Sequence, residues 1–111
     1  MHNDMRDSDD DEAIVWHDTY TIIRANDRAC KMFRCNEDFL IDRNLTDLIY
    51  DAEDFAPLVR LRLQVLREHG YLPEWELGFI RQDGTIFYAR IRSGRDDCGA
   101  YRTVLKYAHE Y

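Results

Sequence analysis

The sequence has only three cysteines, Cys30, Cys35 and Cys98. Their spacing fits neither a zinc ribbon nor a CxxC redox pair. Cys30 and Cys35 lack a second ligand pair or nearby histidines, so we expect reduced thiols and no metal site. Reduced thiols are typical of a cytoplasmic protein, which is the location that we expect.

Long apolar runs and an excess of basic residues are also missing. No run approaches the length of a membrane span, and the N-terminus lacks the charged and then apolar pattern of a secretory signal, so we expect no membrane insertion. The formal net charge is -7. Because nucleic-acid affinity depends on a basic surface and on counterion release, this charge argues against a nucleic-acid partner.

The usual catalytic constellations are absent from the sequence. It contains no Ser-His-Asp set, no phosphate-cradling glycine loop and no metal quartet. His17 and Asp18 are adjacent, but we expect them near a turn without a third partner. The sequence therefore predicts no catalytic residues and a non-catalytic domain.

The length of 111 residues fits one domain with a core of its own. Residues 1–11 are rich in acids and have no large apolar cluster, which predicts a disordered acidic N-terminal tail. The stretch "DSDDDE" lacks the glycine and the spacing of a calcium loop. We expect the folded domain to occupy residues 12–111.

Apolar periodicity and turn residues predict an α+β fold. In chain order we expect strands at 13–17 and 21–25, a helix at 27–33, short helices at 36–41 and 44–50, a long helix at 54–70, and strands at 73–82, 85–93 and 100–108. Asn26 is a suitable N-cap for the first helix. Asp54 is the expected cap of the long helix, because it leaves Pro57 in the first turn. This order indicates an antiparallel sheet covered on one face by helices.

Asp83 and Gly84 predict a two-residue hairpin turn, which pairs Phe79 with Tyr88 and Glu76 with Ile91. The predicted outer face then has three arginines among its residues. It also holds four large side chains, Trp75, Leu77, Phe79 and Tyr88. We expect these four to form an apolar interface in a homodimer. Packing against the N-terminal segment or a neighbouring domain, or scattered exposed aromatics, would also account for these side chains.

The long helix has Arg62 in the middle of its apolar stripe, facing the predicted inner position of Glu76. Arg62 can extend to the surface, form an ion pair with Glu76, or bind a ligand carboxylate or phosphate while Glu76 binds an amine. The candidate ligand-binding residues are Arg62, Glu76, Phe39, Leu58 and Ile91.

Four segments in their order and spacing carry a family resemblance: "AIVWHD", "IIRANDRACKMF", "NEDFLIDRNLTDLI" and "RQDGTIFYARI". Across residues 12–109 the chain resembles a PAS sensor domain. The resemblance implies a five-stranded antiparallel sheet of order 2-1-5-4-3, with short helices and one long helix on one face. It departs from the family pattern at Arg34 and Ile41, where members often have glycines, and in its last strand, where "KYAHEY" replaces the usual exit motif.

The resemblance implies a sensory module that regulates an output or neighbouring signalling domain, such as the histidine kinase of a two-component system or a cyclase. Leu45 stands where flavin photoreceptors have their reactive cysteine, which excludes the covalent photoadduct. The only histidine of the long helix, His69, is at its far end, which argues against a haem. The cofactor stays unknown, and non-covalent flavin stays open.

Two functions therefore remain. In the first, the domain binds a small molecule in the cavity between the sheet and the long helix. In the second, side chains fill the core, and the domain is a ligand-free dimerisation or docking module. A cavity of a few hundred cubic ångströms would favour the first function.

Overall fold

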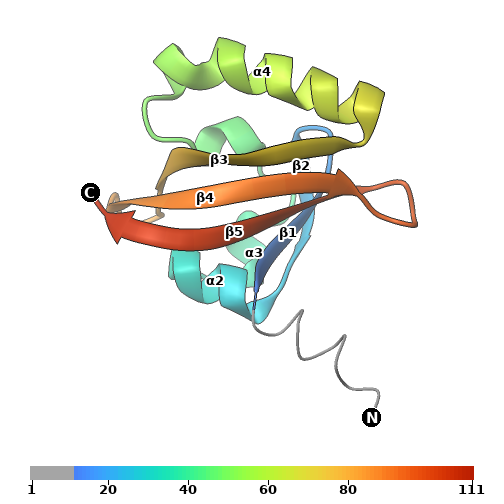
Figure 1. Cartoon of the computed structure of the whole chain (residues 1–111). Helices are drawn as coiled ribbons and strands as arrows, with labels where there is room; N and C mark the ends of the chain where they lie inside the picture. The colour runs from blue at the N-terminus through green and yellow to red at the C-terminus, as the bar shows by residue number, and fades with distance from the viewer. Residues whose placement is uncertain (1–11) are drawn as a thin grey trace.

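The computed structural model describes residues 12–111, so the predicted disordered tail at 1–11 lies outside the described residues. In chain order the elements are β1 (Ala13–Asp18), β2 (Thr21–Ala25), α2 (Asp27–Phe33), α3 (Glu37–Leu40), the 3-10 helix η1 (Leu45–Leu48), α4 (Ala52–His69), β3 (Tyr71–Ile80), β4 (Ile86–Arg95) and β5 (Tyr101–Glu110). The strands form one antiparallel sheet of order β2-β1-β5-β4-β3, which confirms the predicted fold. In Figure 1 the long helix α4 lies along β3, and α2 and α3 lie at the other end of the same sheet.

The core lies between the helices and the inner face of the sheet. The Phe33 ring of α2 makes edge contacts with Phe79 of β3 and Phe87 of β4, at centroid distances of 5.7 and 5.1 Å. From α4, Leu63 and Leu66 are buried against this face. Burying these rings and leucines is the main source of stability for a domain of this size.

Asn26 caps α2 as predicted and also joins it to β1. Its side-chain oxygen accepts hydrogen bonds from the backbone N–H groups of Ala29 and Ile14, both at 3.0 Å, and its amide donates to the carbonyl of Glu12 at 2.7 Å. The helix ends at Arg34, which is in the left-handed conformation with φ 57°. Glycine adopts this backbone conformation most readily, so Arg34 carries some strain there.

The long helix starts earlier than predicted, at Ala52 instead of after Asp54. The backbone N–H of Tyr50 donates to the carbonyl of Gly78 at 2.9 Å, which fixes the chain to β3 just before the helix. The chain therefore has to reverse at once, and Asp51 does so with φ 57°. Pro57 lies inside the helix at an exposed position, where water can reach the carbonyl that its missing N–H leaves unpaired.

The β3–β4 hairpin has a three-residue loop at 82–84 rather than the predicted two-residue turn. The N–H of Arg81 donates to the carbonyl of Thr85 at 2.8 Å, and Gly84 has φ 88° and donates to the carbonyl of Arg81. The loop is a tight turn that ends in a residue with left-handed backbone conformation, Gly84. An Asp-Gly pair fits this loop as well as it fits the predicted two-residue turn. Phe79 consequently pairs with Phe87 and not with Tyr88.

Candidate functional site

The extra loop residue reverses the predicted faces of β3. A register change of one residue moves every side chain to the opposite face. Leu77 and Phe79 are buried on the inner face, and Trp75 is packed against the core. Of the predicted interface residues, only Tyr88 keeps its place on the outer face, where its ring covers Gly78. The predicted apolar outer patch is therefore wrong.

The outer face carries cations where the apolar patch was expected. Across the sheet, Glu76 of β3 pairs with Arg90 of β4, which pairs with Lys106 of β5. One row along, Arg92 of β4 pairs with Val104 and holds Glu12 in an ion pair of 2.8 Å. Exposed charges of both signs are stable in water and do not need a partner surface. The outer face therefore gives no indication of a dimer.

A cavity of about 60 Å³ lies under α4, in the place that the family resemblance implied. Its walls are mostly apolar side chains from β1, α2, η1, α4, β3 and the last two strands. Four polar residues also line it: His17, Arg62, Ser93 and Thr103. Arg62 and Ile91 are the predicted ligand-binding residues that the cavity brings together.

The other three predicted ligand-binding residues lie elsewhere. Glu76 is exposed on the outer face, with a carboxylate oxygen 3.9 Å from Nε of Arg90, because of the register change. Leu58 is 42% exposed, because α4 turns Val59 and Leu63 toward the sheet instead. Phe39 packs beneath the guanidinium of Arg43, 3.8 Å from its ring centre.

Arg62 contacts the cavity without a carboxylate partner. Its guanidinium lies 4.1 Å from the ring centre of Trp75, and Nη2 donates to the carbonyl of Pro73 at 3.2 Å. Nε is buried and has no hydrogen-bond partner. Burial lowers the pKa of Arg62 from its usual value. Of the three alternatives for Arg62, the ion pair with Glu76 is therefore excluded. Nη2 makes its contact at the exposed end of the side chain, as expected for an arginine that extends to the surface, while the buried Nε belongs to a residue that lines the cavity.

His17 begins a chain of three hydrogen-bonded side chains in the wall of the same cavity. Nδ1 is 3.1 Å from the carbonyl of Thr19, and Nε2 is 2.7 Å from the hydroxyl of Thr103. That hydroxyl is 2.8 Å from the hydroxyl of Ser93. The chain runs from β1 through β5 to β4, and His17 has no exposed surface.

Burial keeps the His17 ring neutral. Desolvation lowers its pKa to about 4, and the hydrogen bond to Thr19 and the nearby Asp18 offset this only in part. A neutral imidazole has one N–H and one bare nitrogen, so it donates on one side and accepts on the other. The sequence analysis placed His17 near a turn and missed this role.

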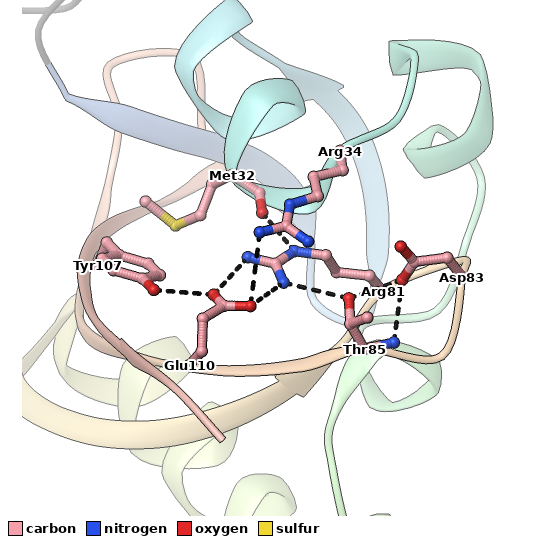
Figure 2. A network of polar contacts seen from close by, with 7 residues as sticks. All are labelled: Met32, Arg34, Arg81, Asp83, Thr85, Tyr107 and Glu110. Atoms are coloured by element: carbon pink, nitrogen blue, oxygen red, sulfur yellow. Dashed lines mark hydrogen bonds and ion pairs between the residues drawn. The ribbon is translucent and has the colours of Figure 1, made fainter.

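A second polar network closes the far end of the sheet (Figure 2). Arg81, which is 5% exposed, donates from Nη1 and Nη2 to the two carboxylate oxygens of Glu110, at 2.7 and 2.9 Å. Nε donates to the carbonyl of Met32 at 2.8 Å, and Tyr107 donates its hydroxyl to Glu110. The hydrogen bond from Arg81 is the main reason that the pKa of Glu110 falls to about 2.

The Arg81 network ties three distant parts of the chain together. Met32 belongs to α2, Arg81 directly follows β3, and Glu110 ends β5. Arg34 adds a contact of 3.5 Å to Glu110. Because the donors of Arg81 are directed to groups of this chain, the network joins these elements.

Among the described residues, 12–111, no group of three histidine, cysteine or acidic side chains could hold a metal ion. No helix in that part of the chain is long and apolar enough to cross a membrane. Cys30 and Cys35 are free thiols, and burial is the main reason that their pKa values are raised.

Comparison with solved structures identifies the same fold. A PAS domain of a protein from Colwellia psychrerythraea matches with a TM-score of 0.76 and 15% identity, over 96% of both chains. The PAS domain of a LuxR-family transcriptional regulator from Burkholderia thailandensis, solved in complex with ethanol, matches with a TM-score of 0.72 and 20% identity, over 86% of this chain and 88% of the other. A light-oxygen-voltage domain matches with a TM-score of 0.70 and 17% identity, over 94% and 82%. No family model and no curated protein matches the sequence.

The sequence carried one signal for the missed cavity residues. Ala13, Val15 and His17 alternate along β1, which places His17 on the face that the two apolar residues bury. Thr103 and Ser93 lie opposite each other in the β4–β5 pair, but only the strand register shows this. Nothing in the sequence connects Arg81 with Glu110.

Proposed function

We propose that this chain, which has the fold of a PAS domain, is a sensory module of a signal-transduction protein and binds a small molecule in the cavity under α4. The observation that carries the proposal is the polar lining of an otherwise apolar cavity. His17, Thr103 and Ser93 form a buried hydrogen-bonded chain there, and Nε of Arg62 has no partner. An unpaired buried donor costs stability, so the unpaired Nε of Arg62 supports a role in binding.

The volume of the cavity limits its ligand. About 60 Å³ is below the few hundred cubic ångströms that the sequence analysis required for ligand binding, so the proposal depends on the polar lining and not on the volume. The volume corresponds to about two water molecules or a molecule of a few heavy atoms. A flavin does not fit, and Leu45 lines the cavity where the resemblance places the reactive cysteine. The ethanol complex of the similar Burkholderia domain is in keeping with a ligand of this size.

The signalling role draws its support from the fold neighbours. They include a PAS domain of a two-component sensor histidine kinase and a domain of a sensory box sensor histidine kinase/response regulator. A module of this kind changes the activity of a neighbouring domain because its ligand binds two conformations with different affinity. On this proposal the domain is cytoplasmic and non-catalytic, and it acts through an output domain.

A fragment screen by ligand-observed NMR tests the proposal. Val59 of α4 lines the cavity, so Val59→Phe fills it, whereas Leu61→Phe changes an exposed position of the same helix. We expect small fragments to bind the wild-type domain and the Leu61→Phe variant but not Val59→Phe. Binding that survives in Val59→Phe, or a wild-type domain that binds no fragment and retains no ligand in native mass spectrometry, would contradict the proposal.

The second candidate function is docking without a ligand, with homodimerisation as its simplest form. The supporting observation is an exposed apolar row on α4, where Phe55, Leu58 and Leu61 are 40, 42 and 57% exposed. Such a row at helical spacing suits a protein partner. Native mass spectrometry of wild type and Leu61→Lys separates the cases: docking through α4 predicts a dimer that the lysine abolishes, and a monomer in both argues against homodimerisation.

A further inference from the structure

We propose that the cavity selects a small uncharged molecule with a hydroxyl group, which donates a hydrogen bond to Ser93 and accepts one from Nε of Arg62. This inference rests on the proposed function, because it assigns the chemistry of the ligand in the same cavity. It follows from the direction of the hydrogen bonds that start at His17.

The Thr19 carbonyl fixes the position of the His17 proton. A carbonyl oxygen only accepts hydrogen bonds, so Nδ1 of His17 carries the hydrogen in the 3.1 Å contact. In the neutral ring Nε2 is then bare and accepts. The hydroxyl of Thr103, 2.7 Å away, must donate to it.

The direction of this bond determines what Ser93 offers to the cavity. The hydroxyl of Thr103 has one hydrogen, which is used on His17, so Ser93 donates its own hydrogen to the oxygen of Thr103 across 2.8 Å. The Ser93 oxygen is left with lone pairs only. A molecule that binds at this end of the cavity therefore has to supply a donor.

Arg62 has the opposite requirement. Its Nε is buried, has no partner and carries a hydrogen, and a guanidinium cannot accept. A ligand group beside it has to accept a hydrogen bond. Because Arg62 and Ser93 line the same cavity of about 60 Å³, a small ligand satisfies both by donating and accepting.

A hydroxyl group meets both requirements, whereas a ketone or a carboxylate meets only one of them. A ketone accepts from Arg62 but cannot donate to Ser93. A carboxylate pairs with Arg62 but faces the lone pairs of Ser93, and the neutral His17 chain supplies no donor to it. The cavity therefore favours alcohols over ketones and acids of the same size.

Two probes of nearly equal size separate these groups. The alcohol 2-propanol donates and accepts, and acetone only accepts. We expect both to shift the NMR signals of cavity residues in the purified domain, with 2-propanol about fivefold tighter because it gains one hydrogen bond. In Ser93→Ala the preference should disappear, while acetone binds as before.

Each contrary outcome has a distinct meaning. Equal or tighter binding of acetone to the wild-type domain overturns the hydroxyl inference and leaves the proposed function standing. If neither probe reaches the cavity although other fragments bind there, the inference also fails. If no compound binds, the proposed function fails with it.

A second measurement covers the case in which Ser93→Ala does not fold. The nitrogen shifts of the His17 ring in the wild-type domain report which nitrogen carries the hydrogen. We expect the Nδ1–H form at pH 7. The Nε2–H form would reverse the donor at Thr103 and overturn the inference.

Discussion

The His17 chain and the Arg81 network are both buried polar systems, but one is neutral and the other is ionised. His17 has no counter-charge in hydrogen-bond contact, so desolvation lowers its pKa to about 4. Arg81 is almost as deeply buried, but it meets both oxygens of Glu110 within 2.9 Å and keeps its charge. The two groups differ first in their ordinary pKa values: a histidine near pH 6.5 loses its proton when it is buried, whereas an arginine keeps its charge. The pairing with Glu110 then offsets the cost of burying the charge of Arg81.

The two systems are expected to have different roles, one in binding and the other in holding the fold together. The neutral chain ends at the cavity and has lone pairs to offer at Ser93. The ionised network is satisfied within the chain and holds the end of β5 against α2 and the hairpin loop. We expect changes in the first system to alter binding and pH response, and changes in the second to alter stability.

Removing the cation of the ionised network should give the largest effect. Arg81→Met keeps most of the apolar stem but removes the hydrogen bonds to Met32 and Glu110, so we expect the free energy of unfolding to fall by about 3 to 4 kcal/mol in urea denaturation. The matched control is Arg90→Met, because Arg90 is exposed and its nearest carboxylate contacts are 3.9 Å long. It should lose less than about 1 kcal/mol. Equal losses in the two variants would show that the network is not the stabilising feature.

Acid should act first on the neutral chain. The pKa of His17 is lowered from 6.5 to about 4, so the folded state binds the proton less readily than the unfolded state. The contribution of neutral His17 to the free energy of unfolding is complete above pH 6.5 and is lost as the pH falls toward 4. At pH 4.5 the loss is about 2 to 3 kcal/mol. Urea denaturation at a series of pH values measures this loss.

Glu110 responds in a lower pH range, which makes the two systems separable. Its pKa is lowered from 4.5 to about 2, so its contribution to stability is present above pH 4.5 and is lost between pH 4.5 and 2.

Two histidine variants test the assignment to His17. If the free energy of unfolding declines between pH 6.5 and 4.5 in His109→Gln, at an exposed position, but not in His17→Gln, the decline belongs to His17. A decline that is the same in both variants would refute the assignment.

Breaking the chain at its centre should have an intermediate effect. Thr103→Val keeps the shape of the side chain but leaves Nε2 of His17 without its donor and Ser93 without its acceptor. We expect a loss of about 1 to 2 kcal/mol in the free energy of unfolding. Thr103→Ser keeps the hydroxyl and serves as the control. If the serine variant loses as much as the valine variant, packing of the methyl group and not the hydrogen bond is responsible.

The architecture was predictable because its signals are local. The Asn26 cap, the end of the long helix at Gly70 and the Asp-Gly pair each fix one element, and their order indicates the sheet and its helical cover. The start of α4 was not predictable, because it depends on the contact between Tyr50 and Gly78. That contact exists only in the folded chain.

The faces of the hairpin were mispredicted because Asp83-Gly84 is compatible with two loop lengths. The alternation of apolar residues would have decided between them. The row of Trp75, Leu77 and Phe79 on β3 and the row of Phe87, Ala89 and Ile91 on β4 share one face only with a three-residue loop. The cavity residues His17, Ser93 and Thr103 could not be assembled, since three strands must first be placed in register.

Glu76 provides the smallest effect and the sharpest test of this register. With a two-residue turn, Glu76 would face Arg62 inside the protein, and its removal would leave a buried cation unpaired, at a cost of about 3 kcal/mol or more. In the structure Glu76 is exposed beside Arg90, with 3.9 Å between the nearest charged atoms. Glu76→Gln should therefore change the free energy of unfolding by less than about 0.5 kcal/mol and leave 2-propanol binding unchanged. A loss of several kcal/mol would show that Glu76 is buried. The side chains of Trp75, Leu77 and Phe79 would then have to lie on the outer face.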